Sequence, residues 1–214
     1  MDLRSVNLSL NEYQALVKKA VRGAGLSWGV ASETARALRL AWQVDWNATA
    51  DLLEILRQHQ QQGPAWGAPL ELDGTWSAGE GALSPLMVGL CLCDQRDALR
   101  GRDQVVERLA QPNLLVPFLL LAAQNTGLGF EVHLDGRVWQ VDAGGVQGAR
   151  AGDQAATVQI IGQAGRAYVQ ALHPRVDLNP AELQGLNGFA GRTYAPATEA
   201  SRLAGAGAGL SDND

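Results

Sequence analysis

Apolar residues recur at helical spacing from the first capping signal onward. In the stretch Ser9-Leu-Asn-Glu12, the serine hydroxyl can accept a hydrogen bond from the glutamate N–H, while the glutamate carboxylate accepts one from the serine N–H. The apolar positions that follow a period of 3.6 residues are Leu10, Tyr13, Leu16, Val17, Ala20 and Val21. Gly23 and Gly25 then supply a stop, so the pattern predicts a first helix that ends there.

The same period predicts two more helices. One runs from about Ser27 to Val44, and the next covers Thr49–Gln61 with Asn47 as its N-terminal cap. Because the link between the first two helices is short, we expect them to pack as an antiparallel hairpin. Trp42 and Trp46 would stack on one face if the second helix continued that far, since residues four apart are neighbours on a helix surface.

The middle of the chain mixes loop signals with apolar runs. Residues 64–81 are rich in glycine and predict a loop or a weak strand pair. Residues 84–99 open with Ser84-Pro85 and suit either a helix or a buried strand, because periodicity does not separate the two. Residues 104–112 predict a short strand, and residues 113–124 predict a buried helix with Pro117 in its first turn.

Alternation of apolar and polar residues over Phe130–Val141 predicts a β-hairpin, with Asp135-Gly136 as its two-residue turn. Pairing Leu134 with Arg137 places Val132 opposite Trp139 and leaves one face apolar. The other face carries Glu131, His133 and Gln140. A second hairpin is expected over residues 156–173 with its turn near 163–165, and a last helix over 180–190 with Asn179 as its cap.

This order of elements predicts an α+β fold: an N-terminal helical hairpin and a third helix, then antiparallel hairpins with additional helices. The alternating βαβ period of a doubly wound fold is absent from the sequence. We expect residues 1–214 to form a single domain. Within it, residues 9–62 can form a helical annex, residues 83–190 an α+β core, and residues 191–214 a C-terminal segment.

Composition narrows the class of protein. An apolar share of 46% and a charged share of 18% are typical of a globular chain. The net charge of −5 comes without a basic run, which argues against nucleic-acid binding. The start lacks a signal-peptide pattern, and the longest apolar run, residues 114–123, is far shorter than the ~20 residues of a membrane span. We therefore expect a cytoplasmic protein that does not bind membranes.

Cysteine and histidine spacing offers no metal or redox motif. Cys91 and Cys93 are separated by one residue, whereas thioredoxin-like and zinc-ribbon pairs have two, so both are expected to be small apolar residues. His59 lies at a glutamine-rich helix end and His173 precedes a proline. The six tryptophans can line an apolar ligand pocket, although large aromatic residues are more commonly part of a core. The sequence assigns no cofactor.

The C-terminal segment holds most of the candidate site residues. Gly205, Gly207 and Gly209 alternate and can expose backbone N–H groups to an anion, to which Arg192 or Arg202 can add charge. Two carboxylates, Asp212 and Asp214, together with the terminal carboxylate, are candidate ligands of a hard cation. The candidates for proton transfer are Tyr194, Glu199 and His133.

Part of that segment also has an explanation in local structure alone. Thr198 can cap a short helix, Glu199 sits in its first turn, and Arg202 sits in its last turn before Gly205. Local structure does not explain the alternating glycines at residues 205–209 or the carboxylates at residues 212 and 214.

Three stretches resemble an uncharacterised bacterial family classed as a domain of unknown function: SLNE at residues 9–12, GAGLSWG at residues 23–29, and RTYAPATEASRLAGAGAG at residues 192–209, followed by DND. This resemblance implies a bacterial source and no chemistry. Residues 23–53 are also similar to the helical start of the malate and sulfolactate dehydrogenase family. That family continues with Ser-His-Gly, where this chain has VDWNATAD over residues 44–51, so dehydrogenase activity is not transferred.

Two functions follow from these observations. The first is a noncatalytic binding or assembly protein whose C-terminal segment docks across the domain or onto a partner subunit, as in a homo-oligomer. The second is a small metabolic enzyme that acts on an anionic substrate, with Arg192 and Arg202 holding the anion. A small anionic ligand or a second copy of the chain is therefore the expected partner.

Overall fold

The computed structural model describes residues 5–95, 99–165 and 172–193. The predicted N-terminal helices are confirmed as α1 (Leu10–Gly23), α2 (Trp28–Gln43) and α3 (Thr49–Gln62), and strand β1 (Val6–Ser9) precedes them. The capping box is present: the backbone N–H of Glu12 lies 3.2 Å from the Ser9 hydroxyl, and the Ser9 N–H lies 2.8 Å from the Glu12 carboxylate. Helices α1 and α2 pack against each other.

The condition for stacking Trp42 on Trp46 is not met, because α2 ends at Gln43 and Asp45 takes a positive φ of 56°. The turn sends the two indoles in different directions. Trp42 meets Tyr13 edge-on, with 6.0 Å between ring centroids. Trp46 meets Trp139 of the sheet edge-on at 5.5 Å. Trp42 therefore packs toward α1, whereas Trp46, just after α2, packs toward the main sheet.

The two apolar segments in the middle of the chain are both helical. Helix α4 (Pro85–Asp94) decides the open choice for residues 84–99 in favour of a helix, although it is shorter than that range. Helix α5 (Val116–Thr126) follows a short 3₁₀ helix, η2 (Pro112–Leu115), and has Pro117 in its first turn as predicted. The two helices pack closely, since a Cβ added at Gly89 would lie 2.3 Å from the Phe118 ring.

The main sheet is five-stranded and antiparallel, in the order β2-β6-β3-β4-β5. Its strands are β2 (Asp103–Leu109), β3 (Leu128–Leu134), β4 (Arg137–Asp142), β5 (Gly145–Gln147) and β6 (Ala156–Ala164). The predicted hairpin register is confirmed, with Leu134 opposite Arg137 and Val132 opposite Trp139. Both turn residues, Asp135 and Gly136, have positive φ, as this turn requires.

The predicted second hairpin is wrong. Strand β6 lies between β2 and β3 and forms ladder pairs with both, so neither of its edges is left for a hairpin partner. Residues 166–171 of that expected hairpin lie outside the described part of the chain.

The chain then returns to its N-terminal helices. Strand β7 (Arg175–Leu178) pairs antiparallel with β1, and α6 (Pro180–Ala190) packs on α1. Asn179 caps α6 as predicted and forms a second capping box with Glu182. A short 3₁₀ helix, η3 (Gly191–Thr193), follows.

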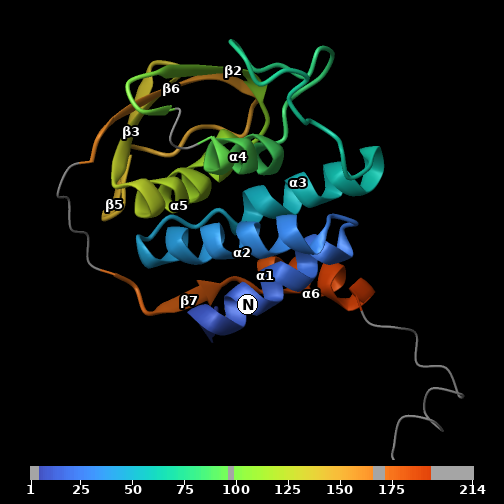
Figure 1. Cartoon of the computed structure of the whole chain (residues 1–214). Helices are drawn as coiled ribbons and strands as arrows, with labels where there is room; N and C mark the ends of the chain where they lie inside the picture. The colour runs from blue at the N-terminus through green and yellow to red at the C-terminus, as the bar shows by residue number, and fades with distance from the viewer. Residues whose placement is uncertain (1–4, 96–98, 166–171, 194–214) are drawn as a thin grey trace, which may run out of the picture.

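These elements form layers in an α+β fold (Figure 1). The apolar face of the main sheet covers α4 and α5, α2 lies against α5, and α1, α6 and the β1–β7 pair lie on the far side of α2. Four of the six tryptophans are buried in this core: Trp42, Trp46, Trp76 and Trp139. Residues 64–81 form a loop anchored by Trp76, which bridges to Val106 of β2. Within the described residues, no helix combines the length and apolar character needed to cross a bilayer.

Candidate functional site: a groove along helix α3

A groove of about 300 Å³ runs beside α3. One wall is a stripe of that helix, because Glu54, Gln58 and Gln62 are four residues apart and share a face. The opposite wall comes from the segments around residues 81–82, 110–111 and 153–155, and Trp66 lines one end. We call this feature the α3 groove, and both of its ends are held by buried polar contacts.

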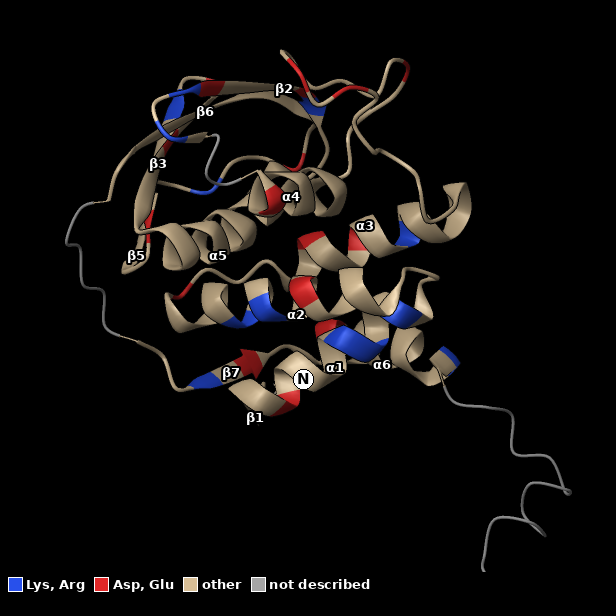
Figure 2. Cartoon of the chain, in the orientation of Figure 1, with Lys and Arg blue, Asp and Glu red and all other residues tan. Residues whose placement is uncertain are grey.

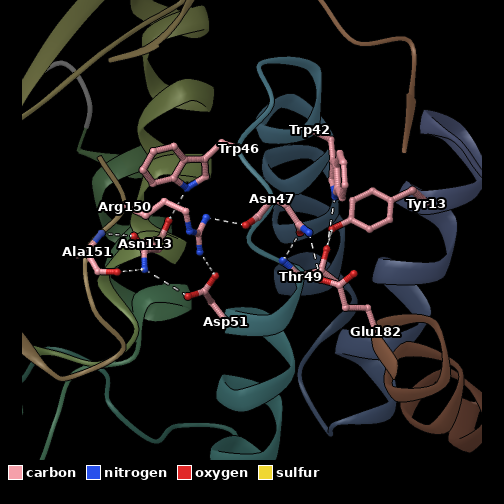
Figure 3. Close-up of polar contacts among 10 residues, drawn as sticks. All are labelled: Tyr13, Trp42, Trp46, Asn47, Thr49, Asp51, Asn113, Arg150, Ala151 and Glu182. Atoms are coloured by element: carbon pink, nitrogen blue, oxygen red, sulfur yellow. Dashed lines mark hydrogen bonds and ion pairs between the residues drawn. The ribbon is translucent and has the colours of Figure 1, made fainter. Parts of the chain in front are cut away.

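At the N-terminal end of α3, Asn113 joins η2 to residue 151 (Figure 3). Its side-chain oxygen accepts from the Ala151 N–H at 2.9 Å, and its amide nitrogen donates to the Ala151 carbonyl at 3.1 Å. The residue is only 1% exposed. The same nitrogen lies 3.5 Å from Asp51, so the amide also connects η2 to α3.

Arg150 closes this end of the helix from the other side. One guanidinium nitrogen donates to the Asp51 carboxylate at 2.6 Å, and the other donates to the Asn47 carbonyl at 2.6 Å. The guanidinium also stacks over Trp46, 5.2 Å from the ring centroid. The Asp51 side chain is 4% exposed, whereas that of Arg150 is 42% exposed. A nearly buried carboxylate is thus neutralised by a cation that reaches it from the surface.

The remaining contacts in Figure 3 connect α3 to α1 and α6. The prediction that Asn47 is the cap of α3 is wrong, because Ala48 occupies the cap position and makes no side-chain cap bond. The Asn47 side chain instead accepts from the Thr49 N–H at 2.9 Å. Its amide donates to Glu182 at 3.0 Å. Tyr13 and Thr49 share a buried hydroxyl contact of 2.9 Å, and burial raises the pKa of the Tyr13 phenol well above its usual range, so the phenol stays protonated.

At the C-terminal end of α3, His59 is a buried residue rather than part of a polar helix end. Its Nε2 lies 2.8 Å from the Ser84 hydroxyl, its Nδ1 lies 3.3 Å from the Gly63 carbonyl, and its ring meets Trp66 edge-on at 5.1 Å. Burial lowers the pKa of His59. The neutral ring therefore donates from Nδ1 to the carbonyl and accepts from Ser84 at Nε2.

This Ser84–His59 pair is structural. Ser84 is fully buried and His59 is 1% exposed, so a substrate has no access to the hydroxyl. A signal for this burial was present in the sequence, since Leu52, Ile55 and Leu56 share the helix face that His59 continues. The neighbouring glutamines made this end of the helix look uniformly polar in the sequence.

Of the sequence-predicted site residues, the structure describes two. His133 lies on the outer face of the sheet, with its Nε2 2.6 Å from Glu131, which also accepts from Gln140 at 2.6 Å. Arg192 follows α6 and stacks over Phe189 at 4.9 Å. The sheet and α6 occupy different layers, so these two residues do not meet (Figure 1).

The other predicted site residues lie outside the described residues: Tyr194, Glu199, Arg202, Gly205, Gly207, Gly209, Asp212 and Asp214. In the described part of the chain, no three or more His, Cys, Asp or Glu residues gather in a way that would hold a metal. Cys91 and Cys93 are free thiols, and burial raises the pKa of Cys91.

The chain has only weak similarity to solved structures, and no similarity in sequence to a protein of curated function was found. The fold is similar to malate dehydrogenase from Entamoeba histolytica, with a TM-score of 0.44 and 13% identity, over 82% of this chain and 50% of that one. It is similar to malate dehydrogenase from Pyrococcus horikoshii OT3, with a TM-score of 0.42 and 11% identity, over 88% of this chain and 66% of that one. The chain thus spans half of the first and less than two thirds of the second.

A family model does match the N-terminal part of the chain, over residues 8–76. Those residues include α1, α2 and α3, together with SLNE and GAGLSWG, two of the three stretches that carried the predicted resemblance. The third, RTYAPATEASRLAGAGAG, lies beyond the match. The family whose model matches residues 8–76 is described as protein of unknown function (DUF3726).

Proposed function

We propose that this chain is a noncatalytic binding protein and that the α3 groove binds a small organic cation, such as a quaternary ammonium compound. The observation that carries the proposal is the composition of the groove. The lining combines Trp66 with two carboxylates, Glu54 and Asp153, and its described residues include no Lys or Arg.

The chemistry of these groups favours a cation. The face of an indole attracts an ammonium group, and tryptophan does so most strongly among the aromatic residues. Carboxylates nearby add Coulomb attraction, and the glutamine amides supply hydrogen bonds that orient a polar substituent. Arg57 pairs with Glu54 at 2.8 Å on the exposed side of α3. A surface pair of this kind is worth only about 0–1 kcal/mol, so a ligand cation can compete with it.

The size and rigidity of the groove support binding of a small molecule. Its volume of about 300 Å³ is at the lower end of the ~300–1,000 Å³ typical of ligand sites. At its two ends, Asp51, His59 and Ser84 are buried, and their contacts hold α3 in place, with the half-exposed Arg150 paired to Asp51. Polar groups that are already paired in this way suit recognition better than turnover.

Choline and its neutral carbon isostere, 3,3-dimethyl-1-butanol, test the proposal directly, since the two molecules differ in charge and have nearly the same shape. We expect choline to raise the melting temperature and to give a measurable Kd by calorimetry, while the isostere does neither. Trp66→Leu should weaken choline binding about 5- to 30-fold, the equivalent of a ~1–2 kcal/mol cation–π contact. Glu54→Gln should weaken it less.

Trp28→Leu is the matched control, because it removes a tryptophan that lies outside the α3 groove. Equal binding of choline and the isostere, binding of neither, or equal losses in Trp66→Leu and Trp28→Leu would each refute the proposal. The competing prediction of an enzyme with an anionic substrate concerns Arg192 and Arg202 and is not supported by the acidic lining of this groove.

A further inference from the structure

A second surface of the chain combines an exposed tryptophan with two cations. Trp28, the first residue of α2, is 52% exposed. The Lys18 ammonium lies 5.7 Å from its ring centroid, and the Arg22 guanidinium carbon lies 5.6 Å from it. These two residues are four apart on α1 and therefore project from the same face of that helix. We call these three residues the Trp28 surface.

The electrostatic potential of the Trp28 surface is positive for a second reason. Helix α2 has 16 residues and begins at Trp28, yet it has no acidic residue in its first turn. The partial positive charge of a helix N-terminus is usually balanced by Asp or Glu there. The Ser27 hydroxyl satisfies the Val30 N–H, so the cap is present while the charge is not balanced. An acidic group with an apolar neighbour fits this surface.

The described chain ends close to this surface. Phe189 of α6 lies against Gly23, directly after Arg22, because a Cβ added at Gly23 would fall 1.9 Å from the Phe189 carbonyl. Arg192 stacks on Phe189, and η3 packs on α1. The described chain therefore ends beside α1, the helix that carries Lys18 and Arg22. Figure 2 shows Lys and Arg on α1 and at the end of the described chain.

The sequence beyond residue 193 contains a complementary stretch. Residues 210–214 read LSDND and combine Leu210 with two acids, Asp212 and Asp214, and no base. The chain from residue 193 to residue 212 can span at most ~65 Å when extended. Helix α1, with 14 residues, is only about 21 Å long. Reach therefore does not limit contact between this stretch and the Trp28 surface.

We propose that residues 210–214 dock on the Trp28 surface of the same chain. The carboxylates of Asp212 and Asp214 pair with Lys18 and Arg22, and Leu210 covers the exposed indole. This surface is separate from the α3 groove, so the docking does not depend on the function proposed for the groove. The docking gives the acidic C-terminal residues a binding surface, whereas the local sequence offers them no structural role.

The indole N–H resonance of Trp28 in the ¹⁵N-labelled full-length chain reports on the docking, and it is assigned by its loss in Trp28→Phe. In the double variant Asp212→Asn/Asp214→Asn, we expect this resonance to move to the position that the unsubstituted chain reaches at about 1 M salt, where exposed ion pairs are screened. Glu199→Gln is the matched control, because it neutralises an acid of the same segment outside residues 210–214. It should leave the resonance in place.

Charge reversal tests the pairing itself. Lys18→Glu/Arg22→Glu should displace the resonance in the same way, and adding Asp212→Lys/Asp214→Lys should restore it. A resonance unchanged by the Asp212→Asn/Asp214→Asn variant, or moved equally by Glu199→Gln, overturns the proposal. A shift that disappears on dilution also overturns it, because the occupant would then be a second copy of the chain. An unchanged circular dichroism spectrum confirms that each variant is folded.

Discussion

Replacing Asn113 by alanine should cost this protein a large part of its stability, although no apolar side chain is removed. Its amide makes two hydrogen bonds with the backbone of Ala151, of 2.9 Å and 3.1 Å, and approaches Asp51 at 3.5 Å. Asn113 is 1% exposed and Asp51 is buried, while Ala151 is half-buried. The substitution therefore removes the partner of a half-buried N–H, of a half-buried carbonyl and of part of the buried Asp51 carboxylate.

The expected loss follows from these contacts. A typical hydrogen bond contributes about 1 kcal/mol net, and a buried polar group left unsatisfied costs about 1–3 kcal/mol. Two lost bonds to one peptide segment should lower the free energy of unfolding by ~2–4 kcal/mol. For a chain of this size, each kcal/mol corresponds to roughly 2–4 °C, so a fall in Tm of about 10 °C is expected.

Urea denaturation and a thermal melt measure this loss, with two comparison variants. Asn187→Ala removes an exposed asparagine of α6 and should change stability by at most ~0.5 kcal/mol. Asn113→Asp keeps an acceptor for the Ala151 N–H but places a second carboxylate beside Asp51, and should be less stable than Asn113→Ala at neutral pH. If Asn113→Ala stays within 0.5 kcal/mol of the unsubstituted chain, or if Asn113→Asp matches that chain, the network does not hold α3 as argued.

Three further predictions concern stability. Burial lowers the pKa of His59 in the folded chain. The contribution of the neutral ring to the free energy of unfolding is therefore complete above the unfolded-state pKa of about 6.5, and it is lost as pH falls through the lower pKa of the folded state. Tm should therefore drop with acidification, and the drop should shrink in His59→Gln; an equal drop in both contradicts this. Gly89→Ala should cost about 1–3 kcal/mol by urea denaturation, since its Cβ would press on the Phe118 ring, and no loss would mean that α4 and α5 separate freely. Ser9→Ala removes the acceptor for the Glu12 N–H and should cost about 1 kcal/mol; an unchanged urea midpoint would show that this cap does not contribute.

The features that were correctly predicted depend on neighbours close in sequence. The predicted capping box at Ser9 and the predicted cap at Asn179 join residues three apart, and the hairpin register is set by the two-residue turn at Asp135-Gly136. Such contacts need no distant part of the chain, so the residue types at fixed offsets are sufficient. The choice for residues 84–99 was different, because an apolar run suits any buried element until its neighbours are known.

The features that were missed depend on segments far apart in sequence. Strand β6 was assigned to a hairpin, but β2 and β3 occupy both of its edges. The Asp51–Arg150 pair joins residues 99 positions apart. The α3 groove exists only because residues 81–82, 110–111 and 153–155 lie against α3. Periodicity along the chain specifies which face of an element is buried, whereas which element covers that face depends on packing among all of them. For this protein, secondary structure was therefore largely readable from local pattern, while the candidate site required the assembled core.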